Sequence, residues 1–180
     1  ASDPDSHDGT LFSLDLDSLA PQAAAPHSPA NAAAITDHDS PQFTVAYIGA
    51  CTGAKLDDLR AAAGMLKSRT VASGTRLLVA PASRADQAQA ADEGVMAILE
   101  SAGATILATA CGMCAGYGPN RLAADDVCIS STARNFRGRM GAPGSRVWLA
   151  SPASVAAAAV TGRLTDPREM DPHGTPRNTI

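Results

Sequence analysis

The sequence predicts an α/β domain, because from Phe43 onward short apolar runs alternate with helical stretches that carry start and stop signals. With 180 residues, the chain is long enough for one domain with its own core. Apolar residues make up 45% of the chain and aromatic residues only 3%, so we expect a core of Ala, Val, Leu and Ile. We therefore expect one three-layer α/β/α domain over residues 43–166.

The predicted elements follow one another without an internal repeat. Residues 1–42 are expected to form an irregular arm or linker, in which the partial alternation of residues 11–16 predicts one short strand. The tail, residues 167–180, is rich in Pro and charge and is expected to be loose. Between them we predict strands over residues 43–48, 75–80, 105–108, 127–130 and 147–149, and helices over 56–66, over 83–101 and from 152 onward.

Local signals support the predicted helices. Ser83, with Asp86 three residues later, offers a capping box. Ser151 followed by Pro152 is typical of an N-cap and a first helical position. The first predicted strand ends at Gly49-Ala50-Cys51, so Cys51 is expected at a strand-to-helix turn.

Composition excludes several classes of partner. The formal net charge of −4 gives no general attraction to nucleic acid. No run approaches the roughly 18 apolar residues that a membrane helix needs, and the polar start lacks the features of a signal peptide. We expect a cytoplasmic protein without nucleic-acid or membrane partners, whose four cysteines are thiols rather than disulfides.

Cys111-Gly112-Met113-Cys114 is a C-x-x-C motif after a predicted strand, and four interpretations compete for it. A thioredoxin-like pair needs a helix N-terminus, but the following Ala-Gly-Tyr-Gly-Pro is a poor helix start. A structural zinc site needs a second close pair, which is missing, and the pair could also be inert. Cys111 and Cys114 with the distant Cys51 would suit an iron–sulfur cubane that leaves one iron without a protein ligand.

The fourth cysteine, Cys128, lies in an apolar strand run, where a free Cys behaves as a small apolar residue. We expect it in the core rather than among the ligands.

A loop over residues 131–141 contains three arginines within six residues: Arg134, Arg137 and Arg139. Guanidinium groups bind carboxylates through paired hydrogen bonds, so this loop is a candidate cradle for an anionic substrate. A solvated basic loop is the alternative.

Four motifs together resemble a known family: GACTGAKLDDLR from Gly49, TACGMC from Thr109, ARNFRGRMG from Ala133 and LASPA from Leu149. In order and spacing they resemble the cluster-bearing domain of the aconitase superfamily, in the manner of the 3-isopropylmalate dehydratase and homoaconitase large subunits. The resemblance covers roughly residues 11–166. Two positions differ, since Gly53 and Ala133 stand where the family usually has Asn.

The resemblance implies a function and a set of site residues. It implies that Cys51, Cys111 and Cys114 hold a 4Fe-4S cluster with one open iron. Arg134 and Arg139 are implied to bind the carboxylate of a small hydroxy acid, which the family reversibly dehydrates and hydrates. The family's acid–base groups lie on other domains, so no catalytic residue is assigned in this chain, and partner chains are expected to supply those domains.

Two hypotheses of function follow. In the first, the chain is a subunit or fragment of a hydro-lyase that is active only with its partner chains. In the second, it is a non-catalytic iron–sulfur domain that acts as an iron or oxygen sensor or as a structural subunit.

Overall fold

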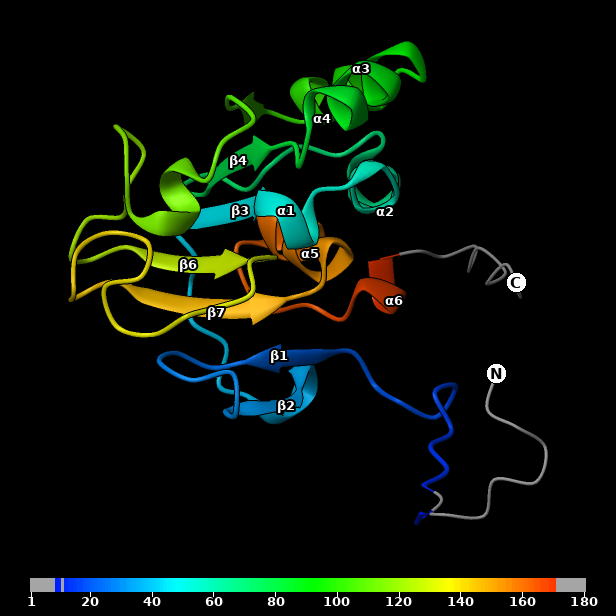
Figure 1. Cartoon of the computed structure of the whole chain (residues 1–180), viewed down its shortest axis with the longest axis vertical. Helices are drawn as coiled ribbons and strands as arrows, with labels where there is room; N and C mark the ends of the chain where they lie inside the picture. The colour runs from blue at the N-terminus through cyan, green and yellow to red at the C-terminus, as the bar shows by residue number, and fades with distance from the viewer. Residues whose placement is uncertain (1–8, 11, 171–180) are drawn as a thin grey trace.

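A computed structural model describes residues 9–10 and 12–170, which build a seven-stranded mixed sheet with the order β2-β1-β7-β6-β3-β4-β5 (Figure 1). The strands are β1 (Gln22–Ala24), β2 (Ala32–Ala34), β3 (Val45–Gly49), β4 (Arg76–Ala80), β5 (Ala104–Ile106), β6 (Val127–Ser130) and β7 (Arg146–Ala150). The helices are α1 (Ala50–Gly53), α2 (Leu56–Leu66), α3 (Arg84–Asp92), α4 (Val95–Ser101), α5 (Pro152–Thr161) and α6 (Pro167–Met170). Two short 3-10 helices are η1 (Ile35–Asp37) and η2 (Gly112–Ala115).

Strands β7, β6, β3, β4 and β5 are parallel, whereas β1 pairs antiparallel with both β2 and β7. The five parallel strands are the five that the sequence predicts, with ends shifted by up to two residues. The α/β class is thereby confirmed.

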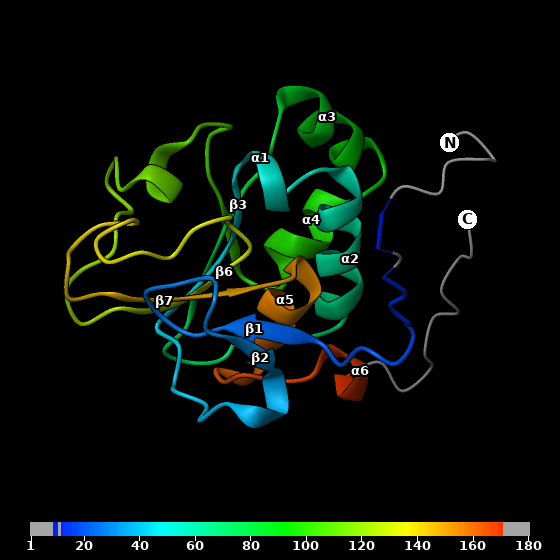
Figure 2. The same cartoon turned by 60° about the horizontal axis from the view of Figure 1, so that its bottom comes forward.

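The helices α2, α3, α4 and α5 pack against one another on one face of the sheet, as Figure 2 shows. Side chains alternate along each strand, so Ala46 and Ile48 of β3 face this helical side, while Val45 and Tyr47 face the other. Small residues such as Ala62 and Ala158 are fully buried between the helices and the sheet.

The opposite face is covered by η2 and by the long connections on either side of β6 (Figure 2). Met113 and Cys114 of η2, with Leu122 and Met140, pack there on β3, β4 and β6. The third layer of the described chain therefore consists of loops and a 3-10 helix.

The predicted arm contributes more structure than its composition indicates. β1 and β2 form a hairpin that extends the sheet beyond β7. The short strand predicted over residues 11–16 is not formed by residues 12–16, and Leu11 lies outside the described residues.

Two further details differ from the sequence predictions. The helix predicted over residues 83–101 is two helices, because Gly94 takes a left-handed conformation with φ of 75° between α3 and α4. At the start of the expected tail, Pro167–Met170 form α6, and the rest of the tail lies outside the described residues. No helix of the described residues is long and apolar enough to cross a membrane.

Candidate functional site

The residues singled out from the sequence follow the carboxyl ends of three parallel strands of one sheet. Cys51 comes after β3, Cys111 after β5 and the arginine loop after β6. In open α/β sheets this edge is where ligands bind, because the loops that leave adjacent strands meet there. The topology therefore accounts for how positions up to 88 residues apart approach one site.

The Cys51 turn is a tight one. Ala50, the first residue of the four-residue α1, has a positive φ of 65°, which non-glycine residues adopt at a cost. Cys51 itself is exposed within this turn. The backbone thus turns sharply to present the thiol at the surface.

Ser131 fixes this turn from the neighbouring strand end. Its hydroxyl accepts a hydrogen bond from the Gly49 N–H at 3.0 Å and donates one to the Gly53 carbonyl at 2.8 Å. The residue is buried, so both bonds are shielded from water. One side chain thereby holds both ends of the segment that carries Cys51.

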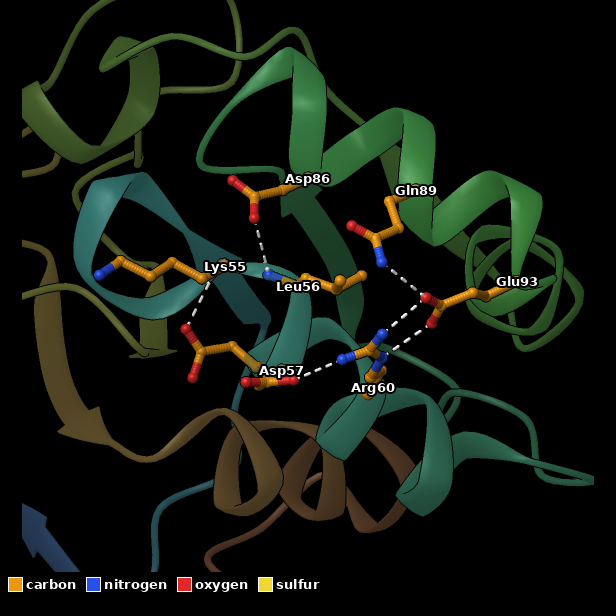
Figure 3. A network of polar contacts seen from close by, with 8 residues as sticks. Lys55, Leu56, Asp57, Arg60, Asp86, Gln89 and Glu93 are labelled. Atoms are coloured by element: carbon orange, nitrogen blue, oxygen red, sulfur yellow. Dashed lines mark hydrogen bonds and ion pairs between the residues drawn. The ribbon is translucent and has the colours of Figure 1, made fainter.

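The chain after Cys51 is fixed to α3, as Figure 3 shows. The Leu56 N–H at the start of α2 donates to Asp86, whose carboxylate also accepts the Ser83 hydroxyl. These two hydrogen bonds hold the pKa of Asp86 below its usual range, and the bond from Ser83 has the larger effect.

A second link between α2 and α3 lies further along both helices. Arg60 of α2 forms paired hydrogen bonds with Glu93 at the end of α3, at 2.6 and 2.7 Å.

The C-x-x-C motif forms the second turn of the site. Cys111 is the N-cap of η2 and is exposed, whereas Cys114 lies inside η2 and is buried. Gly116 ends this helix with φ of 77°, and a Cβ there would come within 3.2 Å of the Arg139 carbonyl. The turn therefore packs closely against the arginine loop.

A small cavity joins the two turns. It has a volume of about 160 Å³, and both Cys51 and Cys111 line it. The rest of the lining is Ala50, Pro81, Ala82, Thr109 and Ala110. Because the other lining side chains are small, they leave an empty space beside the two exposed cysteines.

Cys114, the third predicted ligand, lies apart from the cavity that Cys51 and Cys111 share. Cys114 does not line this cavity, and its sulfur is 3.8 Å from Nη2 of Arg139. Within the described part of the chain, no group of three or more His, Cys, Asp or Glu side chains is arranged to hold a metal ion. The structure thus brings Cys51 and Cys111 to one cavity and leaves Cys114 beside it.

Cys128 is fully buried in β6 among apolar neighbours, and all four cysteines are free thiols. Burial, which disfavours the charged thiolate, raises the pKa of Cys128 far above that of an ordinary thiol. This burial agrees with the expectation that Cys128 belongs to the core.

The arginine loop is anchored by Asn135. Its buried side-chain amide donates to the carbonyls of Ala25 in the arm at 2.9 Å and Val147 in β7 at 3.2 Å. Arg134, on one side of this anchor, is exposed, and its side chain makes no hydrogen bond or ion pair with the described residues. On the other side, Arg139 stacks over the Phe136 ring at 5.6 Å, and its buried Nε has no hydrogen-bond partner in the described chain.

Three residues of the site were not found by sequence reasoning: Tyr47, Ser131 and Asn135. Ser131 and Asn135 begin and anchor a loop that the sequence singled out only for its arginines. Tyr47 lies in the strand predicted over residues 43–48, which also contains the aromatic Phe43, so no sequence signal distinguishes it.

Comparisons with known proteins show which family the chain resembles. The model of the aconitase family (aconitate hydratase) matches residues 1–162. The 3-isopropylmalate dehydratase large subunit 2 of Archaeoglobus fulgidus is 45% identical over 157 residues, which are 87% of this chain and 38% of that protein. The homoaconitase large subunit of Thermus thermophilus is 42% identical over 169 residues, 94% of this chain and 40% of that protein.

This chain spans about two fifths of the length of these relatives. The family match nevertheless includes both cysteine turns and the arginine loop within one continuous stretch. On the family match and on identities above 40% over most of its length, the chain belongs to the aconitase family.

Proposed function

We propose that the chain is the cluster-holding part of an iron–sulfur hydro-lyase that reversibly dehydrates or hydrates a small hydroxy carboxylic acid. The observation that carries the proposal is the shared cavity of Cys51 and Cys111, formed by two turns at one edge of a parallel sheet. Membership in the aconitase family supports the same reaction class.

The residues present fit a 4Fe-4S cluster in their chemistry. Such clusters are held by cysteine thiolates, and Cys51 and Cys111 are exposed thiols on a cavity with a small-residue lining. Cys114, three residues from Cys111, would complete the set. The proposal requires its sulfur to join the other two, with the Arg139 guanidinium beside it to offset part of the negative charge of the thiolates.

A bound cluster with one iron free of protein ligands supplies a Lewis acid for the hydroxyl group of the substrate. In the proposal, Arg134 and Arg139 bind the substrate carboxylate through paired hydrogen bonds. The Nε of Arg139 and the guanidinium of Arg134 support this role, because neither donates a hydrogen bond to the described residues and both can donate to a substrate.

No proton donor or acceptor for the reaction is assigned in this chain. General acid–base catalysis needs such groups in reach of the substrate. We infer that other chains or segments, corresponding to the remaining three fifths of the relatives, supply them. The relatives are named as large subunits, which supports a smaller partner subunit. We also infer a cytoplasmic location, since four free thiols suit a reducing compartment.

Anaerobic reconstitution with iron and sulfide tests the proposal, with the chains that carry the remaining domains present. We expect about four irons per chain and turnover of a hydroxy acid. Cys51→Ser, Cys111→Ser and Cys114→Ser should each lower the iron content and abolish turnover. Cys128→Ala is the matched control and should keep the cluster. Protein that binds no iron and sulfide would refute the proposal.

A further inference from the structure

Tyr47 carries a polar group that the fold does not use. The residue is fully buried in β3, and its hydroxyl has no hydrogen-bond partner among the described residues. A buried hydroxyl without a partner costs about 1–3 kcal/mol, so each such group calls for a reason.

The hydroxyl lies at the base of the Cys51 turn. Tyr47 and Gly49 are on the same face of β3, and an ideal Cβ on Gly49 would come within 2.4 Å of the Tyr47 hydroxyl oxygen. The ring therefore leans along the strand toward its carboxyl end and covers Gly49. Only a glycine at position 49 leaves room for the Tyr47 ring. This position lies two residues before Cys51.

Tyr47 also packs beside the C-x-x-C turn. It belongs to one buried cluster with Met113, Cys114 and Cys128. Together with Gly112 and Met113, it also lines a cavity of about 260 Å³. The residue is therefore close both to the segment that carries Cys51 and to the turn that carries Cys111 and Cys114.

The phenol of a tyrosine carries its proton at neutral pH. A protonated phenol is a hydrogen-bond donor, and the thiolates and sulfides of a bound cluster would be negatively charged acceptors for it.

We propose that Tyr47 is a positioning residue for the iron–sulfur site, whose hydroxyl donates a hydrogen bond to a sulfur of the bound cluster or of its cysteine ligands. This inference rests on the proposed function, because it needs a cluster held by the two turns. The hydrogen bond stabilises the more negative, reduced form of the cluster more than the oxidised form, and so raises the reduction potential.

Tyr47→Phe removes the hydroxyl and keeps the ring, so it tests the inference with little change of packing. Tyr117→Phe is the matched control, since Tyr117 follows the same cysteine turn but is 72% exposed. The protein with its partner chains is prepared both without and with reconstituted iron and sulfide. The readouts are the melting temperature without cluster, the reduction potential with cluster, and the rate of iron loss in air.

The inference predicts opposite effects in the two states. Without cluster, Tyr47→Phe should melt at the same or a higher temperature, because an unpartnered hydroxyl is gone. With cluster, it should have a lower reduction potential and lose iron about two- to tenfold faster, which corresponds to the usual net worth of one hydrogen bond. Tyr117→Phe should match the unsubstituted protein in all three measurements.

Three contrary results can be told apart. If the unsubstituted protein takes up no iron and sulfide, the proposed function fails and the inference fails with it. If it takes up the cluster, but Tyr47→Phe has the same potential and the same rate of iron loss, only the inference is overturned. A Tyr47→Phe variant that melts lower without cluster also contradicts it, because the hydroxyl would then be stabilising the empty fold.

Discussion

A Cβ atom added to Gly53 would lie 2.2 Å from the carbonyl oxygen of Ser131. Gly53 is buried two residues after Cys51, and Ser131 is the residue whose hydroxyl holds the Cys51 turn. The segments that follow β3 and β6 therefore approach so closely that only a glycine fits at position 53. The aconitase-family resemblance leads one to expect Asn there, and in this chain the backbone of Ser131 occupies the space that its side chain would need.

We predict that Gly53→Ala lowers the free energy of unfolding by about 1–3 kcal/mol, because the added methyl group overpacks a backbone contact. Urea unfolding measures the change. Gly64→Ala is the matched control, since Gly64 lies in α2 with open space around its Cα. That substitution should raise the free energy of unfolding by up to about 1 kcal/mol. Equal effects of the two substitutions would contradict the close approach at Gly53.

Ser131→Ala should loosen the Cys51 turn. It leaves the Gly49 N–H and the Gly53 carbonyl without their partner, at a cost of about 1–3 kcal/mol. The alkylation rate of Cys51, measured against that of Cys111 in the same sample, should rise. Ser145→Ala serves as the control, because the buried Ser145 hydroxyl bonds only within its own turn. An unchanged ratio of the two rates in Ser131→Ala would show that the hydroxyl does not hold the turn.

The acid side of the stability curve should depend on Asp86. Because its pKa in the folded protein is lowered, chiefly by the hydrogen bond from Ser83, its contribution is present above the unfolded pKa of about 4. That contribution is lost as the pH falls through the lower folded value. We predict that Asp86→Asn is less stable at neutral pH and loses less stability than the unsubstituted chain below about pH 4.

Urea unfolding at a series of pH values measures this difference. Asp92→Asn is the control, because Asp92 ends the same helix and its side chain makes no hydrogen bond or ion pair with the described residues. It should follow the profile of the unsubstituted chain. If Asp86→Asn follows that profile as well, the hydrogen bonds at the start of α2 contribute nothing in solution.

The parallel strands were predictable because each is a short apolar run bounded by turn or loop residues. For β6 the prediction has both ends correct. The position of Cys51 at a strand-to-helix turn and the burial of Cys128 follow from the same local pattern. The hairpin of β1 and β2 was missed, because five of its six residues are Ala, which has no strand preference, and its pairing depends on β7.

The contacts that shape the site could not be predicted in this way. Ser131 and Gly49 are 82 residues apart, and nothing in the local sequence of either specifies the other. The lean of Tyr47 over Gly49 depends on the packing of a whole sheet face, which periodicity does not describe. Long-range packing therefore determines the details of the site, whereas local pattern determines its location at the strand ends.

Arg139 should be the more sensitive of the loop arginines to a conservative change. Lys keeps the charge of Arg139 but cannot form paired hydrogen bonds or stack on Phe136 as a guanidinium does. In the reconstituted protein with its partner chains, we predict that Arg139→Lys raises the KM for the hydroxy acid about ten- to hundredfold, the worth of one charged hydrogen bond. Arg137 is exposed in the same loop and makes no side-chain hydrogen bond or ion pair with the described residues, so Arg137→Lys should leave the KM unchanged. An Arg139→Lys protein with an unchanged KM would show that the substrate carboxylate binds elsewhere. The melting temperatures of the two variants are compared as well. If they are equal, a rise in KM comes from weaker substrate binding and not from a loss of folding.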